Sequence, residues 1–299
     1  MKSLTHYFEG LPGDAYQSFA DTVAKAMPFL EHMISIDVSQ EDILLYRIRE
    51  SRAALHRREE IFHVPVCERH SITQQRYSIP GWPCLYLGGS IYICWEELGR
   101  PDLKHCWFSQ FNYCSNQQVR VLNMAYRPAA IAARLNANAG TKDAPHFIRH
   151  AIAYAVCWPI IAACSVRVWH KDAPFKAEYV IPNLLTQWVK LSCKCEGVRY
   201  FSCLVDKYGE SIAAVANYAF PCHDLQHGDY CKSLRAWFEL TDPIGWYGAL
   251  TPAFPSGLPR KDFQMSLDNC PVMYGSTDFA KIEMGLSSIS VQRTSGQLQ

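Results

Sequence analysis

The amino-acid sequence predicts a packed protein of mixed α and β structure. Hydrophobic residues make up 49% of the 299 positions and aromatic residues 13%, which is enough for a sizeable core and excludes global disorder. Short apolar runs of strand length are interspersed with segments whose apolar residues recur at helical spacing. The expected strands are residues 43–49, 84–87, 106–113, 118–122, 197–202 and 234–241, and the expected helices are residues 15–34, 91–98, 128–136, 151–166 and 173–188.

Charge and cysteine content narrow the class of protein. The formal net charge is +1, from 29 basic and 28 acidic residues, so nothing favours binding to nucleic acid or to an anionic membrane. The sequence has 13 cysteines, and its first residues, MKSLTHYFEG, lack the long apolar core of a secretory signal. We therefore expect reduced thiols and a cytoplasmic location.

The first expected strand carries two arginines on one face. Arg47 and Arg49 are two residues apart, so their side chains point in the same direction. Together they could hold a pyrophosphate, because guanidinium groups bind phosphate oxygens in pairs. The alternative, which the residues alone favour, is a surface pair near the acidic residues Glu50, Glu59 and Glu60.

Residues 73–99 are expected to form a turn, a strand and a helix in succession. Two prolines and a glycine within 78–83 prevent a helix there, and the apolar run 84–87 fits a buried strand. Ser90 is placed to cap a helix over 91–98, and Gly99 to end it.

This helix distinguishes two adjacent acids. Glu96 lies almost opposite the apolar stripe and four residues before Arg100, which predicts a solvated ion pair. Glu97 lies at the margin of the stripe, where a carboxylate costs free energy unless it is paired. Spacing alone leaves open whether Glu97 reaches water from a rim position or serves a site.

The most apolar window is residues 151–166, AIAYAVCWPIIAACSV. Its sixteen residues are interrupted by Pro159, whereas a membrane span needs about 20 without interruption. We therefore expect a buried helix, kinked or restarted at Pro159, and no membrane anchor.

Several phrases carry a family resemblance. Arg76, Tyr86 and Glu97 stand ten and then eleven residues apart, within phrases such as LYRIRE, FHVP, QRYSIPG, LYLGGS and CWEELGRPD. In this order the phrases resemble the larger members of the RES-domain family, which is named for an arginine, a glutamate and a serine. The likeness covers roughly residues 43–202.

The resemblance implies a fold, an activity and partners. The fold is an α+β, ADP-ribosyltransferase-like domain whose curved β-sheets form an NAD cleft surrounded by helices. We expect it at residues 41–235, between an N-terminal helical extension over 1–40 and a C-terminal extension over 236–299 with a frayed end. Family members are toxins that hydrolyse or phosphorolyse NAD, or that attach ADP-ribose to a protein. They are paired with a helix-turn-helix antitoxin, so an antitoxin or other inhibitor protein is an expected partner beside NAD. Separately from the resemblance, the terminal extensions could form a homodimer.

The resemblance also assigns the site. Arg76 would hold the diphosphate or ribose, and Arg47 would complete the phosphate grip. Tyr86 would stack near the nicotinamide ring. Glu97 would orient the ribose and stabilise a sugar cation, because glycosidic cleavage passes through an oxocarbenium-like state. Ser202, at the end of a strand, would position substrate or hydrogen-bond Glu97.

Further candidates and alternatives remain open. His63 is a secondary binding candidate through the phrase FHVP, although a histidine beside aromatic residues is more often structural. Arg69 has the same status. The acceptor of the cleaved ribose could be water, phosphate or a protein side chain, the last giving an ADP-ribosyltransferase.

A different class of function is a non-enzymatic, zinc-stabilised interaction module. Its candidate ligands are Cys222, His223, His227 and Cys231, four within ten residues. Standard zinc motifs pair two separated ligand clusters, so we predict no metal site.

Overall fold

The structure is a computed structural model that describes residues 2–34, 36–37, 44–115, 118–205, 214–224, 230–250, 262–268, 270–292 and 294. Its strands are β1 (Ile36–Asp37), β2 (Leu45–Glu50), β3 (Cys84–Gly88), β4 (Cys106–Tyr113), β5 (Arg120–Met124), β6 (Gly197–Phe201), β7 (Ala216–Pro221), β8 (Phe238–Leu240), β9 (Ile244–Gly245), β10 (Gln264–Leu267) and β11 (Cys270–Met273). Its α-helices are α1 (Lys2–Phe8), α2 (Pro12–Leu30), α3 (Ile91–Glu97), α4 (Pro128–Ala137), α5 (Ala144–Cys164), α6 (Val180–Ser192), α7 (Lys232–Trp237), α8 (Trp246–Ala249) and α9 (Asp278–Ser287). Short 3₁₀ segments are η1 (Arg58–Ile61), η2 (Val66–Ser71), η3 (Leu103–His105), η4 (Ala177–Tyr179) and η5 (Tyr274–Ser276).

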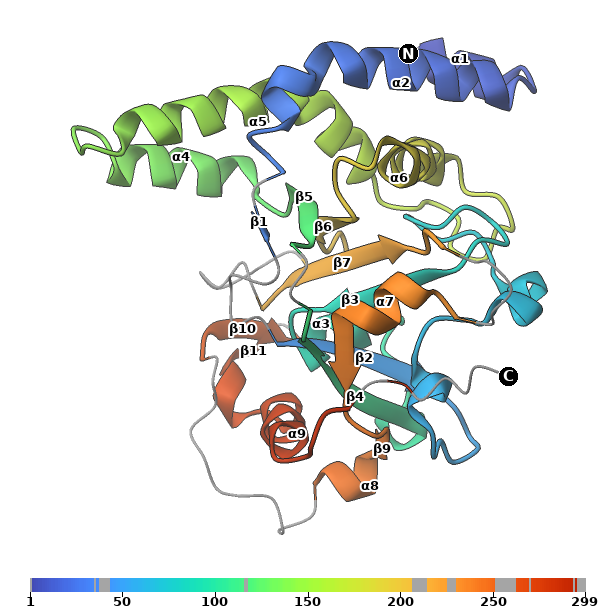
Figure 1. Cartoon of the computed structure of the whole chain (residues 1–299). Coiled ribbons are helices and arrows are strands. Elements are labelled where there is room, and N and C mark those ends of the chain that lie inside the picture. The colour runs from blue at the N-terminus through green and yellow to red at the C-terminus, as the bar shows by residue number, and fades with distance from the viewer. Residues whose placement is uncertain are drawn as a thin grey trace.

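One large mixed sheet forms the centre of the molecule (Figure 1). Its strand order is β1-β5-β6-β7-β3-β2-β4-β8, with β9 beside β4. β5 and β6 are parallel, and the other paired neighbours are antiparallel. Helices surround this sheet, which confirms the predicted α+β class.

The sheet divides between β2 and β3. In the part of the chain that the structure describes, these two strands pair at a single position, Tyr46 with Gly88. β3 pairs along its whole length with β7, and β2 along its whole length with β4. Neighbouring strands that share one paired position diverge beyond it, so β2 and β3 are the described neighbours in this sheet that pair least.

Gly88 also sets the distance between β3 and α3. A Cβ at this position would lie 2.5 Å from the Cys94 Sγ and 2.6 Å from the Ile93 Cγ2. Only a glycine therefore lets the helix pack this closely on the strand. The helix that carries Glu97 is held directly against the dividing point of the sheet.

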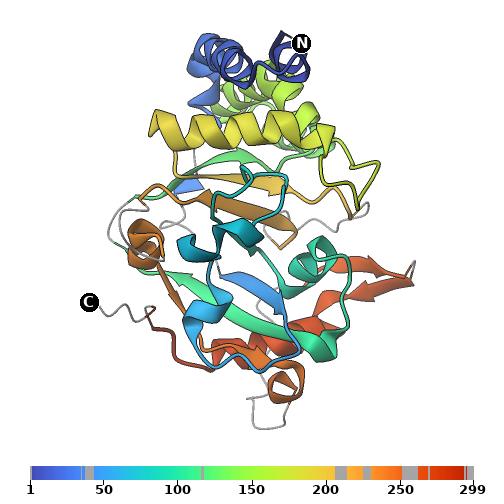
Figure 2. The same ribbon diagram turned by 90° about the vertical axis from the view of Figure 1, so that its right-hand side faces the viewer.

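Three apolar clusters cover the sheet. The first joins α2, α5 and α6 to one face, with Val23, Leu185 and Val198 among its members, and Figure 2 shows this helical layer above the sheet. The second lies under α7 on the opposite face. The third packs α3 and the C-terminal helix α9 against β2 and β4, through residues such as Ile93 and Ile282.

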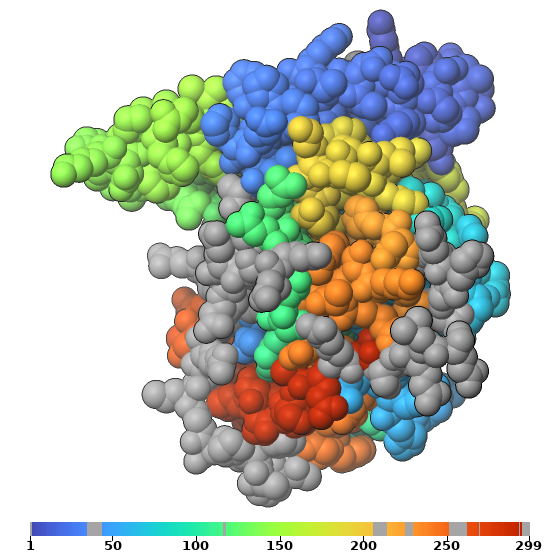
Figure 3. Space-filling model, viewed as in Figure 1, coloured from blue at the N-terminus to red at the C-terminus, as the bar shows by residue number. Residues whose placement is uncertain are grey.

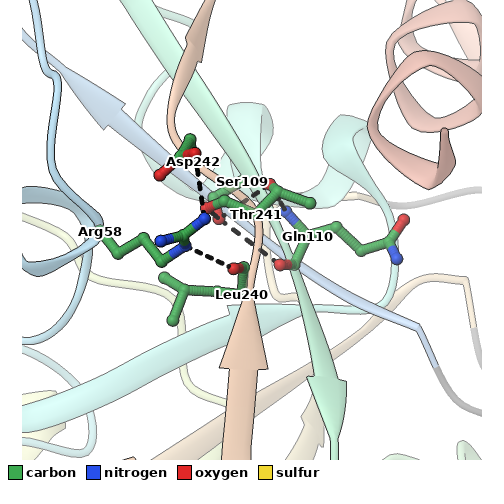
Figure 4. A network of polar contacts seen from close by, with 6 residues as sticks. All are labelled: Arg58, Ser109, Gln110, Leu240, Thr241 and Asp242. Atoms are coloured by element: carbon green, nitrogen blue, oxygen red, sulfur yellow. Dashed lines mark hydrogen bonds and ion pairs between the residues drawn. The ribbon is translucent and has the colours of Figure 1, made fainter. Parts of the chain in front are cut away.

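A polar network joins η1, β4 and the end of β8 (Figure 4). The Arg58 guanidinium donates to the Leu240 carbonyl at 3.0 Å and forms an ion pair with Asp242 at 3.0 Å. On the other side of the strand, the buried Thr241 hydroxyl accepts the main-chain N–H of Gln110 at 3.2 Å. Residues 236–299 were predicted as an extension, and this network ties their first part to the central sheet.

Two sequence expectations need correction. We expected a strand over 234–241, but residues 232–237 form α7, because Leu234 and Trp237 bury one helical face, and only β8 is a strand. The expected strands and helices leave the Pro- and Gly-rich residues 242–259 as a loop, and β9 and α8 lie within that range. Residues 251–259 fall outside the described residues, as do 293 and 295–299 near the expected frayed end.

The expectation of a buried helix around Pro159 was also only half right. α5 is one continuous helix that includes Pro159, and it buries one face through Ala153, Cys157 and Ile161. Its other face is exposed, with Ile148 and Ile152 each 50% accessible. The sequence could not show this, because both faces of the helix are apolar.

Candidate functional site

Helix α3 presents Glu97 at its C-terminal end. The Ser90 hydroxyl caps the helix by accepting the Ile93 N–H at 3.3 Å, and it donates to the Ala214 carbonyl at 2.6 Å. Gly99 follows with φ of +80°, which a glycine adopts without strain. Both predicted helix boundaries are therefore confirmed.

The burial of Glu96 contradicts the prediction, whereas the position of Glu97 agrees with one of the two possibilities that the spacing left open. Glu96 forms the expected pair with Arg100, with Nη2 to Oε1 and Nε to Oε2 both at 3.0 Å, but it is 4% exposed and not solvated. Glu97 is the exposed one. The cause is the C-terminal segment, which covers the side of α3 that the helical periodicity assigns to water.

Two polar side chains hold the Glu97 carboxylate. The Asn217 Nδ2 donates to Oε1 at 2.9 Å, and the Ser202 hydroxyl is also hydrogen-bonded to the carboxylate. Surrounding protein raises the pKa of Glu97 by desolvation, the largest effect, while Ser202, the Arg76 charge and Asn217 each lower it. The Glu97 side chain is accessible to water, although many protein atoms surround its carboxylate. A ligand could therefore replace the water that contacts this carboxylate.

Ser202 follows directly after β6 and is fully buried. Its Oγ accepts the Leu204 N–H at 3.1 Å. With one oxygen lone pair engaged in this way, the hydroxyl proton is directed to Glu97. The structure thus brings Glu97 and Ser202 into contact, although 105 positions separate them in the sequence.

Arg76 lies in the loop before β3, beside the C-terminal end of α5. Its Nη1 donates to the carbonyls of Cys164 and Val166 at 2.8 and 2.9 Å, and its guanidinium lies 5.0 Å from the centre of the Tyr179 ring. Unpaired carbonyls at a helix end favour such a cation. Nε and Nη2 of Arg76 make no hydrogen bond with any described residue, so these donors remain for a ligand near Glu97.

Tyr86 lies on β3 and is half-buried. Its hydroxyl accepts the Tyr77 N–H at 3.1 Å and shares a hydrogen bond with the Ser78 hydroxyl at 2.7 Å. These bonds fasten the loop that carries Arg76 to the strand. A stacking role for the Tyr86 ring remains a prediction.

Arg47 lies one residue beyond the point where the sheet divides. Its Nη1 donates to the Tyr86 carbonyl at 2.8 Å, and its Nε is buried without a hydrogen-bond partner. Burial, followed by the charge of Arg49, lowers the pKa of Arg47 to about 10. Arg47 is half-buried, and no carboxylate among the described residues pairs with it.

Arg49 does not join Arg47 in a phosphate grip. Its side chain is exposed, and its Nη1 donates to the main-chain carbonyl of Glu60. For Arg49 the surface alternative therefore holds, and Arg47 is the arginine that faces the dividing point of the sheet.

The structure does not bring His63 to this site. His63 is fully buried, its Nδ1 contacts the Val64 carbonyl at 2.8 Å, and its Nε2 accepts the Cys231 N–H at 2.9 Å. Burial lowers its pKa to about 4, so the ring is neutral at physiological pH. With both nitrogens engaged inside the protein, His63 is a structural hydrogen-bonding residue, and NAD binding by it stays an untested prediction. Arg69 lies on η2 with an exposed side chain.

The possible metal ligands do not form a site within the described part of the chain. Cys222 and Cys231 are buried neighbours, and the Cys231 thiol donates to Asp224 at 2.7 Å. The His223 ring instead approaches the Glu196 carbonyl, at 3.4 Å. No group of three potential ligands is found among the described residues, and His227 lies outside them.

Sequence reasoning missed Asn217. Residues 212–220 fitted either a strand or a helix end, so the direction of each side chain was unknown. The available signal is an amide within the otherwise apolar run ANYAFP, which forms β7. A polar group in a buried strand is expected to have a specific partner, and here the partner is Glu97.

We expect Asn217→Ala to raise the pKa of Glu97, because the variant removes a donor that stabilises the ionised carboxylate. Titration of the Glu97 side-chain carbonyl by ¹³C NMR measures this directly. Asn138→Ala, at the exposed end of α4, is the control and should leave the titration unchanged. An unaltered titration in Asn217→Ala would show that the hydrogen bond does not form in solution.

Comparison with known proteins gives a relative in Bacillus subtilis. No family model matches the chain. The chain is similar to the candidate toxin YopC of Bacillus subtilis (strain 168), with 33% identity over 264 residues. This match covers 82% of the chain but 57% of YopC, so the chain spans little more than half the length of that relative. A solved structure, the MbcT–MbcA toxin–antitoxin complex of M. tuberculosis, matches with 14% identity and a TM-score of 0.35 over 75% of this chain and 93% of that one. That likeness is too distant to carry an argument.

Proposed function

We propose that this chain is a toxin-like enzyme that degrades NAD by cleaving the nicotinamide–ribose bond, as a glycohydrolase or a phosphorylase. The observation that supports this best is the Glu97 carboxylate, held by Ser202 and Asn217 within the electrostatic reach of Arg76. The resemblance to the RES family and the similarity to YopC support the toxin-like part of the proposal.

The proposed reaction needs charge stabilisation more than proton transfer. As the C1′–N bond breaks, its electron pair leaves with nicotinamide, which departs as a neutral ring and requires no general acid. Positive charge develops on the ribose, where the Glu97 carboxylate stabilises it. Water or phosphate then adds to C1′, and the products are nicotinamide with either ADP-ribose and a proton or phosphorylated ADP-ribose.

Two arginines complete the proposed site. Arg47 supplies a half-buried cation that no described carboxylate pairs with, and Arg76 supplies the two donors that no described residue uses. A diphosphate between them would provide the missing negative charge, because guanidinium groups bind phosphate oxygens bidentately. Tyr86 would stack on the heteroaromatic leaving group from β3. An antitoxin-type protein, of the helix-turn-helix class that the resemblance implies, would inhibit this cytoplasmic activity.

Consumption of NAD by the purified chain tests the proposal. We expect wild type to release nicotinamide, and Arg76→Ala to lose at least about a hundredfold in turnover, the scale for removing an electrostatic group from a transition state. Arg52→Ala, at an exposed position outside the proposed site, is the matched control and should keep full turnover. Mass spectrometry of the products, with and without phosphate, identifies the acceptor.

Two outcomes would contradict the proposal. Label from NAD that stays on a protein would favour an ADP-ribosyltransferase that uses the same residues. Absence of any turnover, together with stoichiometric zinc by elemental analysis, would favour the non-enzymatic interaction module.

A further inference from the structure

The loop that carries Arg76 is docked on the segment that leads into α6. The main-chain N–H of Lys176 donates to the Gln74 Oε1 at 2.7 Å, and the Gln74 Nε2 donates back to the Lys176 carbonyl at 3.4 Å. In Figure 3 the cyan surface of the segment before β3 lies next to the yellow surface of α6. The start of α6 therefore sets the position of a loop that lies 102 positions earlier in the chain.

Two side chains at the start of α6 hold Arg76 directly. Tyr179 is the residue immediately before α6, and Asn183 follows one helical turn later. The Asn183 Nδ2 donates to the carbonyls of Gln75 and Arg76 at 3.0 and 2.9 Å, which fixes the main chain there. The Tyr179 ring lies under the guanidinium, with its centre 5.0 Å from the Arg76 Cζ. One turn of helix thus holds both the main chain and the charged group of Arg76.

The ring contact leaves the remaining donors of Arg76 available. A cation–π contact attracts the guanidinium charge and needs no oxygen acceptor. The guanidinium is planar and rigid, so the bonds from Nη1 to the carbonyls of Cys164 and Val166, together with the Tyr179 ring, also define where Nε and Nη2 point. Those two donors make no hydrogen bond with any described residue. The contacts thus orient the guanidinium without using the donors that a ligand needs.

Tyr179 has the position of a site residue and not of a core residue. It is half-buried, it is not a member of the three apolar clusters that the described residues form, and its hydroxyl makes no hydrogen bond with any of them. Burial raises the pKa of the Tyr179 phenol, while the Arg76 charge lowers this pKa and the Glu97 charge raises it. The ring therefore lies within electrostatic range of both residues to which the proposed function assigns chemistry.

We propose that Tyr179 and Asn183 are positioning residues, which hold Arg76 in the orientation that lets its Nε and Nη2 bind the diphosphate of NAD. Asn183 fixes the main chain at Arg76, and the Tyr179 ring supports the guanidinium. Neither residue has to touch the ligand, because both act through Arg76. This inference rests on the proposed function, since it concerns the ligand that Arg76 binds.

Isothermal titration calorimetry with ADP-ribose tests the proposal without any turnover, because ADP-ribose carries the diphosphate but has no nicotinamide–ribose bond. We expect Arg76→Ala to raise the Kd about tenfold or more, the scale of a lost hydrogen bond to a charged group. Tyr179→Leu and Asn183→Ala should raise the Kd by up to the same factor, whereas Tyr179→Phe should bind as wild type does, because it keeps the ring. Tyr247→Leu, which replaces an exposed tyrosine on α8, is the matched control and should leave the Kd unchanged.

A double-mutant cycle identifies how Tyr179 acts. If it acts through Arg76, adding Tyr179→Leu to Arg76→Ala causes no further loss of affinity. A further loss in the double variant, a Kd of Tyr179→Leu equal to that of wild type, or weakened binding by Tyr179→Phe would each overturn the positioning role. Far-ultraviolet circular dichroism checks that every variant is folded, and where Tyr179→Leu does not fold, the same cycle with Asn183→Ala decides.

These outcomes separate the inference from the proposed function. A wild type that binds ADP-ribose but releases no nicotinamide from NAD contradicts the proposed function alone. A wild type that cleaves NAD, with an ADP-ribose affinity that Tyr179→Leu leaves unchanged, contradicts the positioning role alone. A wild type that neither binds ADP-ribose nor cleaves NAD contradicts both.

Discussion

The Glu97→Gln variant is expected to lose at least about a hundredfold in NAD turnover, because glutamine keeps the shape of the side chain but removes the charge that stabilises the ribose cation. The variant can keep the hydrogen bond from the Asn217 Nδ2, because the amide oxygen of glutamine is still an acceptor. Comparison of kcat and KM separates the two possible roles. A fall in kcat with little change in KM identifies charge stabilisation, whereas a rise in KM alone would identify substrate binding.

The same variant is expected to be more stable than wild type at pH 7. The folded protein raises the pKa of Glu97 above its value in the unfolded chain, so the folded state favours the neutral form. The ionised carboxylate therefore costs stability at pH values above the folded pKa. As the pH falls through this window the cost disappears, and below the unfolded value of about 4.3 wild type and variant should melt alike. Thermal midpoints measured between pH 4 and pH 8 check both the sign and the window.

Glu96→Gln is the matched control for this experiment. Glu96 is the adjacent residue, but it is buried and bound by both branches of the Arg100 guanidinium. Loss of that ion pair should destabilise the fold by about 1 kcal/mol or more and leave turnover nearly unchanged. If Glu97→Gln and Glu96→Gln behaved alike, the carboxylate of Glu97 would have no special role.

These two acids show what sequence could predict and what it could not. The boundaries of α3 depend on local chemistry, namely the Ser90 cap and a glycine at positive φ, and both were predicted. Burial of Glu96 depends on residues far along the chain. The ring centres of Phe279 and Trp95 are 5.3 Å apart, and Asp268 Oδ1 lies 2.8 Å from Arg100 Nη1. The C-terminal segment therefore covers the face of α3 that helical periodicity assigns to water.

Long-range pairing explains the other differences. Asn217 contacts Glu97 only because β7 pairs with β3, and no local pattern reports that pairing. Arg47 and Arg49 look equivalent in sequence, but Arg47 lies beside the division of the sheet and Arg49 beside η1. His63 was a candidate because it lies in the phrase FHVP, which resembles the RES family. In the structure its side chain points into the core. The family resemblance therefore predicted which segments of the chain form the site. Which side chains in those segments contact one another follows only from the structure.

The C-terminal segment bears directly on the position of Glu97. The Glu283 carboxylate on α9 is 7% exposed, and its Oε1 accepts the Ile91 N–H at 2.8 Å and a hydrogen bond from the Tyr274 hydroxyl. Ile91 is the first residue of α3, so Glu283 satisfies one of the N–H groups that a helix start leaves unpaired and also opposes the positive end of the helix. One side chain of the C-terminal segment thus fixes the helix whose other end carries Glu97.

We expect Glu283→Ala to lower the free energy of unfolding by about 2–6 kcal/mol, because it leaves two buried donors without an acceptor, at about 1–3 kcal/mol each. Glu283→Gln is the matched variant, since its amide oxygen can still accept the Ile91 N–H, and it should recover most of that loss. Urea denaturation measures both. Where Glu283→Ala stays folded at low temperature, NAD turnover should fall through kcat, because α3 shifts and Glu97 moves away from the ribose. Equal denaturation midpoints for Glu283→Ala and wild type would show that α3 does not depend on this carboxylate.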